Sequence, residues 1–342
     1  MRGQRHLISD NASGVHPAVM AAIERANVGH AIAYGADDVT ARAGAVFRER
    51  FGPRARTCIV STGTAANVVG LCAVTRSFDA VVCADSSHLH RDECGAPEWH
   101  LGSKLLVAPT RDGKLHPDAV RPLLVGTDMV HRAPPRVLSI SQCTELGTVY
   151  TPAEVAELAA LCREHDMLLH VDGARLCNAA VALGVTLREI TTDVGVDLVS
   201  FGGTKNGLMG AEAVVLLTPD AATDVERVRK RATQLSSKLR FLSAQLVALL
   251  EGTLWSDNAT HANAMARRLA EGVGAIEAVE ITAPVQTNVV FAKIPRSWVE
   301  PLCAHSRFLV WDPERTVVRW MTSFDTSPED IDTFIAAMRR LP

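Results

Sequence analysis

Short runs of apolar residues recur through roughly the first two thirds of the chain, and stretches with helical spacing of apolar positions lie between several of them. The clearest helical stretch covers 152–165, which begins with a proline and places Ala, Val and Leu at helical spacing. Apolar runs that alternate with helices indicate a largely parallel sheet covered on both faces. We therefore predict an α/β fold with a mostly parallel seven-stranded sheet. The expected strands are 57–60, 80–84, 104–108, 136–140, 167–171, 197–201 and 213–217.

The pattern changes after this region. The stretch 218–252 predicts mostly helix, and most of its basic residues are expected on a solvated face. A further helix is expected from 257 to about 271, followed by a mixture of strands (285–292, 316–321) and helices (297–305, 328–340). We therefore predict three parts: an irregular lead-in over 1–14, a large α/β domain over 15–257 and a small α+β domain over 258–342.

Composition narrows the functional classes. The 342 residues are 47% hydrophobic and 21% charged, and 35 basic against 38 acidic residues give a net charge of −3. This balance, with few aromatics, does not favour a nucleic-acid surface. We expect no signal peptide and no membrane span, because no apolar run is long enough. The eight cysteines include no Cys-x-x-Cys pair, and several lie in apolar runs, which predicts reduced thiols and a cytoplasmic protein.

One lysine, Lys205, stands in a glycine-rich turn directly after an expected buried strand, in Ser-Phe-Gly-Gly-Thr-Lys-Asn-Gly over 200–207. The glycines leave room for a ligand close to the amine, because they carry no Cβ. Burial lowers the pKa of a lysine, and a neutral amine can form a Schiff base with an aldehyde or ketone. A solvated loop lysine is the alternative. The spacing of a phosphate-binding P-loop is absent.

The first strand is followed by a second motif, Ser-Thr-Gly-Thr-Ala-Ala-Asn over 61–67, which opens an apolar helix. Gly63 and Thr64 offer backbone N–H groups, a hydroxyl and the positive end of a helix dipole, which together suit a phosphate group. The alternative is an ordinary helix cap at Thr62 or Thr64.

The fifth strand ends in His170-Val171-Asp172-Gly173-Ala174-Arg175. Strand alternation predicts that His170 and Asp172 lie on the same face. A carboxylate there can pair with a protonated ring nitrogen, and Arg175 can bind a carboxylate through its planar fork. A surface Asp–Arg pair with a helix cap is the alternative.

The second strand is followed by two histidines, His88 and His90, and by Cys94. No further ligand pair at zinc spacing accompanies them, so we do not expect a metal site. A histidine that stacks on a flat ring, or one without a role, is the better interpretation.

Taken in chain order, these groups supply a phosphate turn, a stacking ring, a carboxylate, an arginine and a lysine. Pyridoxal 5′-phosphate (PLP) requires this set. Asp172 and Lys205 follow strands one αβ unit apart, so both are expected at the same edge of the sheet.

The motifs also carry a family resemblance that covers nearly the whole chain. The sequence resembles the low-specificity L-threonine aldolases of the β-eliminating lyase group, within the fold-type I PLP enzymes (aspartate aminotransferase-like), and is most similar to the branch that includes phenylserine aldolases. The stretches that carry the resemblance are 9–11 (Ser-Asp-Asn), 33–35 (Ala-Tyr-Gly), 62–67 (Thr-Gly-Thr-Ala-Ala-Asn), 92–98 (Asp-Glu-Cys-Gly-Ala-Pro-Glu), 170–175 (His-Val-Asp-Gly-Ala-Arg) and 201–207 (Phe-Gly-Gly-Thr-Lys-Asn-Gly).

The resemblance implies roles for individual residues toward the cofactor. Lys205 would carry PLP, Asp172 would hold its pyridine nitrogen, and His88 would stack on its ring. The phosphate and the remaining cofactor contacts would fall to Gly63, Thr64, Arg175, Thr204 and Arg240.

The same resemblance implies how the substrate binds. Arg175 and Arg319 would hold its carboxylate, and Ser9, Asn11 and Tyr34 would line the site. Some of these positions reach in from a second subunit in relatives, so a homodimer or homotetramer with shared active sites is implied. Glu145 stands where many threonine aldolases have His-Asn-Gly, although the most similar branch also has Glu there.

The implied reaction is reversible cleavage of a β-hydroxy-α-amino acid, such as L-threonine or L-phenylserine, into glycine and an aldehyde. The base for the β-hydroxyl is His88, or a water held by His88 or Glu145. Alternatives that keep PLP are a transaldolase, a β-eliminating lyase and a racemase. A catalytically silent homologue is disfavoured, because such a protein has no need of Lys205, Asp172, Arg175 and Arg319 together.

Overall fold

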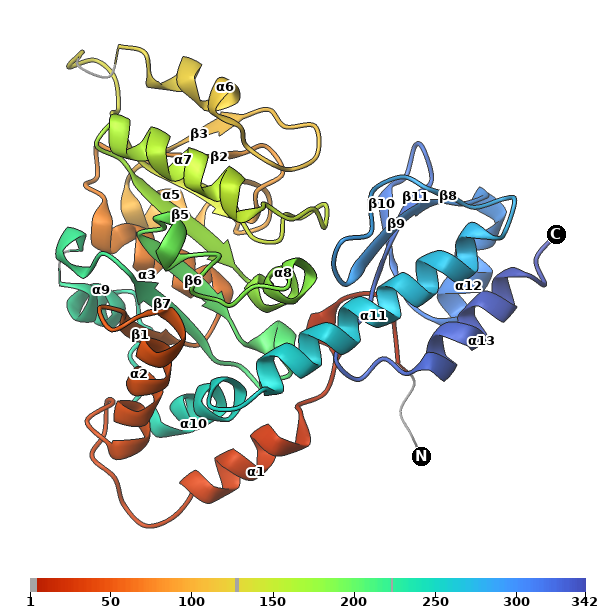
Figure 1. Ribbon diagram of the computed structural model, residues 1–342, viewed down its shortest axis with the longest axis horizontal. Coiled ribbons are helices and arrows are strands. Elements are labelled where there is room, and N and C mark those ends of the chain that lie inside the picture. Colours follow the sequence, from red (N-terminus) through yellow and green to blue (C-terminus); the bar gives the residue numbers. More distant parts are fainter. Residues whose placement is uncertain (1–4, 127–128, 223) are drawn as a thin grey trace.

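A seven-stranded sheet forms the centre of the larger part of the computed structural model, which describes residues 5–126, 129–222 and 224–342 (Figure 1). The strand order is β1-β7-β6-β5-β4-β2-β3. The pairs among β2 to β6 are parallel, whereas β7 runs antiparallel to both of its neighbours. The predicted mostly parallel α/β fold is therefore confirmed. The strands are β1 (Arg56–Val60), β2 (Ala80–Ala84), β3 (Lys104–Ala108), β4 (Pro135–Ser141), β5 (Leu168–Gly173), β6 (Leu198–Gly202) and β7 (Glu212–Leu216).

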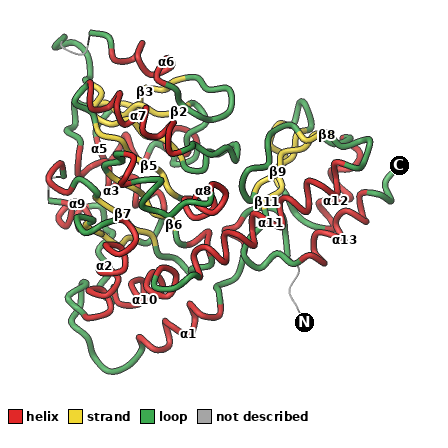
Figure 2. Tube along the Cα trace, in the orientation of Figure 1, coloured by secondary structure: helices red, strands yellow, loops and turns green. Residues whose placement is uncertain are grey.

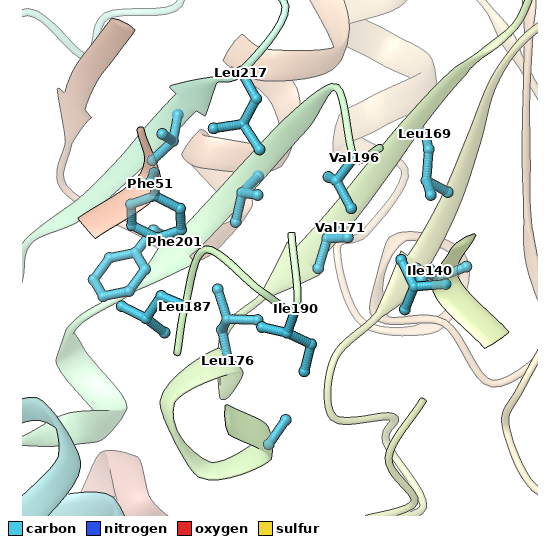
Figure 3. Close-up of a cluster of buried hydrophobic side chains, with 14 of the residues drawn as sticks. Phe51, Ile140, Leu169, Val171, Leu176, Leu187, Ile190, Val196, Phe201 and Leu217 are labelled. Atoms are coloured by element: carbon cyan, nitrogen blue, oxygen red, sulfur yellow. The ribbon is translucent and has the colours of Figure 1, made fainter. Parts of the chain in front are cut away.

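Helices cover both faces of this sheet. Neighbouring residues of β5 illustrate the alternation, because Leu168 packs into the hydrophobic cluster on one face and Leu169 into that on the other. One face is covered by α3 (Gly63–Val74), α5 (Ala96–Leu101) and α9 (Val225–Arg231). The other is covered by α1 (Pro17–Ala26), α2 (Asp38–Phe51), α7 (Pro152–Glu164), α8 (Leu176–Leu183) and α10 (Arg240–Leu250). Figure 3 shows part of this second core, with Phe51 of α2 and Leu176 of α8 beside Phe201 and Val171 of the sheet.

Local sequence signals fix where the helices begin. α7 has Pro152 at its first position, and Thr151 and Glu154 form a capping box in which each side chain accepts a hydrogen bond from the other residue's backbone N–H. α3 begins after Thr62, whose hydroxyl oxygen accepts a hydrogen bond from the N–H of Ala65 at 3.1 Å. The remaining short helices are α4 (His88–Arg91) and α6 (Pro117–Val120), with 3-10 turns at Asp10–Ala12, Arg121–Leu124, Thr192–Val194, Thr204–Asn206, Pro219–Ala221 and Arg296–Trp298.

A four-stranded antiparallel sheet, in the order β10-β11-β9-β8, forms the smaller part of the molecule (Figure 2). Its own core centres on Trp320 and Phe334, which are fully buried and pack edge to face. Leu7 of the lead-in belongs to this core, and its carbonyl oxygen accepts a hydrogen bond from the N–H of Met321. The elements are β8 (Glu280–Ile281), β9 (Val289–Lys293), β10 (Leu309–Asp312), β11 (Val317–Met321), α12 (Val299–His305) and α13 (Pro328–Met338).

One long helix, α11 (Leu254–Gly274), joins the two parts (Figure 1). It packs against α8 of the larger part and α13 of the smaller part. The helix runs without a break through the position between 257 and 258 where the sequence places the domain boundary. The division into 15–257 and 258–342 stays a proposal.

The structure corrects several predicted elements. The stretch 218–252 is mostly helical, as predicted, but it forms two helices, α9 and α10, instead of one. The break follows Thr233, which adopts a positive φ, and Gln234, whose side-chain oxygen accepts a hydrogen bond from the backbone N–H of Ser61. Strand β9 begins later than predicted, and β8 and β10 were missed because they are two and four residues long. Residues 1–4 of the lead-in and residue 223 lie outside the described residues. No described helix combines the length and apolar character needed to cross a bilayer.

Candidate active site

The carboxyl ends of four strands, β1, β4, β5 and β6, meet at one edge of the large sheet. Asp172 lies at the end of β5, and the turn that carries Lys205 follows β6. Because β7 runs in the opposite direction, its first residue, Glu212, also lies at this edge. The helix that begins at Gly63 starts here after β1. The topology therefore brings together groups that are far apart in the sequence.

The Lys205 turn is packed so tightly that its first two residues must be glycines. A Cβ on Gly202 would lie 2.5 Å from the carbonyl oxygen of Ala174, and a Cβ on Gly203 would lie 2.6 Å from that of Ala211. Real Cβ atoms are not found so close to a backbone oxygen, so any larger residue would displace the turn. The glycines therefore fix where Lys205 lies, in addition to leaving space beside it.

Lys205 is partly buried, and the pKa of its amine is lowered. The positive charge of Arg175 is the largest cause and burial is the second, while Asp10, Asp172 and Glu212 act in the opposite direction. A lowered pKa increases the fraction of neutral amine near physiological pH, which is the nucleophilic form. The solvated loop lysine considered as an alternative does not describe this environment.

Glu212 binds the backbone of the Lys205 turn through its side chain. Its carboxylate accepts hydrogen bonds from the backbone N–H of Gly203 at 2.7 Å and, more weakly, from that of Thr204 at 3.4 Å. Burial raises the pKa of Glu212 to about 6, although these hydrogen bonds and Lys205 lower it in part. Thr204, expected near the cofactor, is therefore fixed through its backbone by a residue that was not singled out from the sequence.

A chain of hydrogen bonds connects Asp172 to His88. The side-chain amide of Asn67 donates both to Asp172 Oδ2 at 2.9 Å and to Glu93 Oε1 at 2.8 Å. Glu93 Oε1 also accepts from His88 Nδ1 at 2.8 Å. A carboxylate oxygen that accepts from Nδ1–H selects the neutral tautomer of His88 in which Nε2 carries no proton. The pKa of His88 is raised by the hydrogen bond to Glu93, against the opposing effect of burial.

His170 lies below Asp172, on the same face of the sheet, as strand alternation predicts. It is fully buried between two hydroxyls, with Nδ1 2.8 Å from Ser139 Oγ and Nε2 2.9 Å from Ser200 Oγ. Burial lowers the pKa of His170 to about 4, although Asp172 acts in the opposite direction. A neutral histidine at this position supports the floor of the site without adding charge.

Glu145 reaches the same site from the loop after β4. Its Oε1 accepts hydrogen bonds from Ser141 Oγ at 2.7 Å and from the backbone N–H of His88 at 2.8 Å. Its Oε2 is buried and has no hydrogen-bond partner among the described residues. Burial raises the pKa of Glu145, with Asp172 adding to the shift, while the hydrogen bonds reduce it. Glu145 therefore positions the start of α4 through its Oε1.

Arg175 is largely buried, with 14% of its side chain exposed, and forms a bidentate ion pair with the buried Asp10. Its Nε donates to Asp10 Oδ2 at 2.7 Å and its Nη2 to Oδ1 at 2.8 Å, and Asn288 donates a further hydrogen bond to Asp10 Oδ2. Burial alone would lower the pKa of Arg175, but Asp10 raises it above its ordinary value. Arg175 therefore pairs with the buried Asp10, and the alternative interpretation, an Asp–Arg pair on the surface, does not describe it. Asp10 occupies one edge of the guanidinium that the sequence assigns to the substrate carboxylate.

Arg319 of β11 approaches from the smaller part of the molecule. One of its terminal nitrogens donates to the carbonyl oxygen of Ile8 at 3.4 Å, and its guanidinium lies 5.5 Å from the ring centre of Trp311. Its Nε is buried and has no partner among the described residues. The pKa of Arg319 is lowered by burial and by the positive charge of Arg175. An anion bound between the two arginines would relieve both effects.

The start of α3 fits a phosphate group. Gly63 and Thr64 form its first turn, where the backbone N–H groups point out of the N-terminal end and have no partner within the helix. A Cβ on Gly63 would meet no atom within 4 Å, so open space lies next to this backbone. Thr62 acts as the helix cap, as the alternative interpretation proposed, but its one hydrogen bond satisfies only a single N–H of the turn.

Two other candidate residues, Tyr34 and Arg240, lie apart from this cluster, whereas Ser9 and Asn11 flank Asp10 in the segment that contacts the Lys205 turn. Tyr34 has a positive φ and a side chain 53% exposed, and its N–H donates to Ser237. Arg240 donates two long hydrogen bonds to backbone carbonyls in the surface loop before Tyr34. Ser9 caps the 3-10 turn at Asp10–Ala12, and Asn11 is exposed. Among the described residues, no hydrogen bond or ion pair joins these four to Lys205 or Asp172 directly.

The sequence did not assign roles to Asp10, Asn67, Glu93 or Glu212. The first three lie within the stretches that carry the family resemblance, so the sequence motifs already contained these residues although no role was assigned to them. Glu212 is an acidic residue directly before an apolar run, and an acid in that position needs buried partners. The described residues contain no cluster of three or more His, Cys, Asp or Glu side chains that could hold a metal ion.

Comparisons with known proteins agree with this geometry. Residues 6–296 match the family of β-eliminating lyases. The chain is 42% identical over 325 residues to the low specificity L-threonine aldolase of Pseudomonas aeruginosa, which covers 94% of each chain. The structure of threonine aldolase from Leishmania major is 27% identical, has a TM-score of 0.94, and covers 98% of this chain and 99% of its own.

A more distant structure shows the same fold. A C-DES mutant with glycine covalently linked to its PLP cofactor has a TM-score of 0.72 at 16% identity, and covers 99% of this chain and 97% of its own. The fold is therefore that of the fold-type I PLP enzymes, as the resemblance implies. With the matched family model and the relative at 42% identity, the chain belongs to the β-eliminating lyase family, among the low-specificity L-threonine aldolases.

Proposed function

We propose that this protein is a PLP-dependent aldolase, a carbon–carbon lyase that cleaves β-hydroxy-α-amino acids such as L-threonine or L-phenylserine into glycine and an aldehyde, and that catalyses the reverse reaction. The observation that carries the proposal is the buried turn that presents Lys205, with a lowered pKa, at the same sheet edge as Asp172. The name of the relative from Pseudomonas aeruginosa supports the same activity.

The residues present fit PLP. Gly63 and Thr64 offer unpaired N–H groups beside open space for its phosphate, and Asp172 would hold its ring nitrogen. Lys205 would bind its aldehyde, and His88 would lie against its ring. Both Asp172 oxygens are already fixed by hydrogen bonds, from Asn67 and from the N–H of Ala174, so the carboxylate is preorganised for a cation. When bound, PLP withdraws electrons from the bond between Cα and Cβ.

The substrate is expected to bind through its carboxylate. Arg319 Nε has no partner among the described residues, and Arg175 has one edge free of Asp10. A carboxylate placed between them gains charge-assisted hydrogen bonds from both guanidinium groups. Asp10 would hold Arg175 in orientation, and Ser9 and Asn11 would lie beside it in the same segment. This arrangement fixes the amino acid so that its side chain points toward His88.

We assign removal of the β-hydroxyl proton to His88 Nε2. The hydrogen bond from Nδ1 to Glu93 fixes the tautomer that leaves Nε2 unprotonated. Glu145 is less suited as the base, because its Oε1 already accepts hydrogen bonds from Ser141 Oγ and from the backbone N–H of His88. We assign to Glu145 the positioning of His88 through the backbone N–H at 2.8 Å.

We also propose that two subunits complete each active site, in a homodimer or homotetramer. Tyr34 and Arg240 lie on the surface instead of beside Lys205, and large apolar side chains around them are exposed, including Val28 (75%) and Ile32 (72%). Such a patch is typical of a surface buried by another chain. A cytoplasmic location is proposed on the eight free cysteines.

The decisive experiment compares the purified protein with Lys205→Ala. The unmodified protein should bind PLP and release glycine from L-threonine or L-phenylserine, whereas the variant should lose both the absorbance of the lysine-bound cofactor and the turnover. Lys104→Ala, at an exposed position at the start of β3, is the matched control. Unchanged activity in Lys205→Ala would refute the proposal. Release of ammonia and a keto acid would instead identify elimination, and return of the enantiomer would identify racemisation.

Shared active sites are tested by mixing two inactive variants. Tyr34→Ala and Lys205→Ala subunits, unfolded and refolded together, should recover part of the activity, because some hybrid sites then contain both native residues. No recovery in a mixture whose hybrids are detected by mass spectrometry would contradict the sharing of Tyr34 between subunits.

A further inference from the structure

One buried amide, that of Asn67, lies between two carboxylates of the candidate site. Its side-chain nitrogen donates two hydrogen bonds, one to Asp172 Oδ2 at 2.9 Å and one to Glu93 Oε1 at 2.8 Å. All three side chains are buried, so these hydrogen bonds are shielded from bulk water. A donor shared in this way stabilises the negative charge of both acids at once.

The two carboxylates fix the orientation of this amide. Turning the amide over would place its oxygen against two groups that accept hydrogen bonds, which is unfavourable. In the observed orientation Asn67 Oδ1 is buried and has no partner among the described residues. The cost of that oxygen is offset by two hydrogen bonds to charged groups, which are about twice as strong as neutral ones. The amide is therefore placed to serve the carboxylates.

Helix α3 carries Asn67 to this position. Gly63 and Asn67 are four residues apart in the helix, so they lie on the same face, one turn from each other. That face presents the start of the phosphate turn and, one turn later, the amide. Asparagine is a weak helix former and is mostly exposed in proteins. A buried asparagine in an otherwise apolar helix therefore indicates a role in the site that the helix faces.

The two acids that Asn67 binds have different roles in the proposed reaction. Asp172 would hold the ring nitrogen of PLP, whereas Glu93 accepts the hydrogen bond that fixes the tautomer of His88. The same amide therefore contacts the partner of the cofactor and the partner of the base.

Other charged groups face His88 and Asp172 from neighbouring elements. Lys205, after β6, lowers the pKa of His88, whereas the charge of Asp172 raises it. Glu145, after β4, accepts a hydrogen bond from the backbone N–H of His88. A substitution of Asn67 leaves these groups in place, so its effect can be separated from theirs. The titratable groups around the pair, besides Glu93, are Lys205, Glu145 and the buried His170.

We propose that Asn67 is a positioning residue with two functions in the aldolase reaction. It holds Asp172 in place for the ring nitrogen of PLP, and through Glu93 it sets the basicity of His88. The proposal rests on the proposed function and deepens it, because it links the cofactor and the base through a single neutral side chain.

The first test needs neither cofactor nor turnover. The pKa of His88 is measured by NMR on the complete chain, freed of PLP and carrying isotope-labelled histidine, and the His88 signal is identified by its loss in His88→Gln. Asn67→Ala removes a donor that stabilises the Glu93 anion, so the His88–Glu93 pair binds its proton more tightly. We expect the pKa of His88 to rise by at least about half a unit. Glu93→Gln, which removes the charge instead, should lower it.

The second test is the affinity of the same cofactor-free chain for PLP, followed by absorbance during a titration. Asn67→Ala leaves Asp172 Oδ2 without its donor, so the carboxylate is no longer held in one orientation. We expect PLP to bind about tenfold more weakly, as for the loss of one charge-assisted hydrogen bond.

The matched control is Asn263→Ala. Asn263 is buried to the same degree as Asn67, at 1% exposed, and it exchanges hydrogen bonds with Asn178 between α11 and α8. Its loss should lower the temperature of unfolding but change neither the PLP affinity nor the pKa of His88. A merely structural role of Asn67 would give this result as well.

A second variant, Asn67→Asp, keeps the shape of the side chain and replaces the amide by an acid. When ionised it adds a negative charge, and when protonated it can donate to only one of the two carboxylates. It should therefore also raise the pKa of His88. Thermal unfolding shows which of the two Asn67 variants is folded, and either one is sufficient for the first test.

Three results would overturn the proposal: the pKa of His88 stays the same or falls in a folded Asn67 variant, PLP binds to folded Asn67→Ala as tightly as to the unmodified protein, or Asn263→Ala produces the same changes. The proposed aldolase activity fails separately, if the unmodified protein releases no glycine. The two failures are distinguishable because neither Asn67 test measures turnover.

Discussion

The hydrogen bond between Glu93 and His88 provides a direct test of the proposed base. Glu93 Oε1 accepts from both His88 and Asn67, whereas Oε2 is buried without a partner among the described residues. In Glu93→Gln the amide oxygen takes the place of Oε1 and keeps both hydrogen bonds, and the amide nitrogen takes the place of the unpartnered Oε2. The substitution therefore removes the negative charge and leaves the geometry of His88 in place.

The size of the effect follows from this one contact. The Glu93 hydrogen bond is the largest cause of the raised pKa of His88. A hydrogen bond to a charged group is stronger than one to a neutral group by about 1.4 kcal/mol, which corresponds to about one pKa unit. The His88 side chain is 39% exposed, so solvent screening keeps the effect at this lower bound. Glu93→Gln should lower the pKa of His88 by about one unit.

The assay is the pH dependence of kcat/KM for glycine release, measured between roughly pH 5 and 9. If neutral His88 takes the proton, the rate falls as the pH drops below the pKa of His88. Because Glu93→Gln lowers that pKa, its acidic limb should move to lower pH by about one unit. Asp92→Asn, which removes an exposed charge from the neighbouring position, serves as the control. An acidic limb that stays in place in Glu93→Gln, or that moves equally in both variants, refutes the assignment.

Three further predictions concern stability. Gly202→Ala should lower the free energy of unfolding by about 1–3 kcal/mol and reduce PLP occupancy, as measured by thermal unfolding and by cofactor absorbance. Gly252→Ala, where a Cβ meets no atom within 4 Å, should change neither quantity. Asp10→Ala leaves Arg175 buried without its partner, so urea unfolding should show a loss of about 3–5 kcal/mol. Glu212 has a raised pKa of about 6, so its contribution to stability is present below its unfolded value and is lost as the pH rises through 6. As the pH rises from 4.5 to 7.5, the free energy of unfolding of Glu212→Gln should therefore increase by about 2 kcal/mol relative to that of the unmodified protein. If urea unfolding shows the same pH dependence for both proteins, this expectation is contradicted.

Most of the large sheet was predictable because its strands are buried on both faces and read as continuous apolar runs. The direction of β7 was not predicted, although the sequence contains the necessary information. Only nine residues separate the end of β6 at Gly202 from the start of β7 at Glu212. A parallel crossover needs a dozen or more residues, so β7 can only return antiparallel.

The break between α9 and α10 could not be read from local sequence. The region has helical composition, but Gln234 binds the backbone of Ser61, which is 173 residues away in the chain. Short strands such as β8 have too few residues to show a period of two. In the first case a long-range partner determines the structure, and in the second the pairing of β8 with the next strand, β9, does so.

In the candidate site, too, some residues were predictable from the local sequence and others were not. Lys205, Asp172 and Gly63 follow apolar runs, so the rule that ligands bind at the carboxyl ends of strands was enough to select them. Their roles toward PLP stay predictions. The Asp10–Arg175 pair joins residues 165 positions apart and depends on where the lead-in crosses the sheet, so no local signal predicts it.

The unbroken helix α11 has a mechanical consequence. Its 21 residues give a rod about 31 Å long, at 1.5 Å per residue, that is anchored on the large sheet at one end and carries the four-stranded sheet at the other. Bending the rod would break backbone hydrogen bonds in its middle, so the helix behaves as one stiff body. Because Arg319 lies on β11 of the four-stranded sheet, its position relative to Arg175 depends on the orientation of this helix.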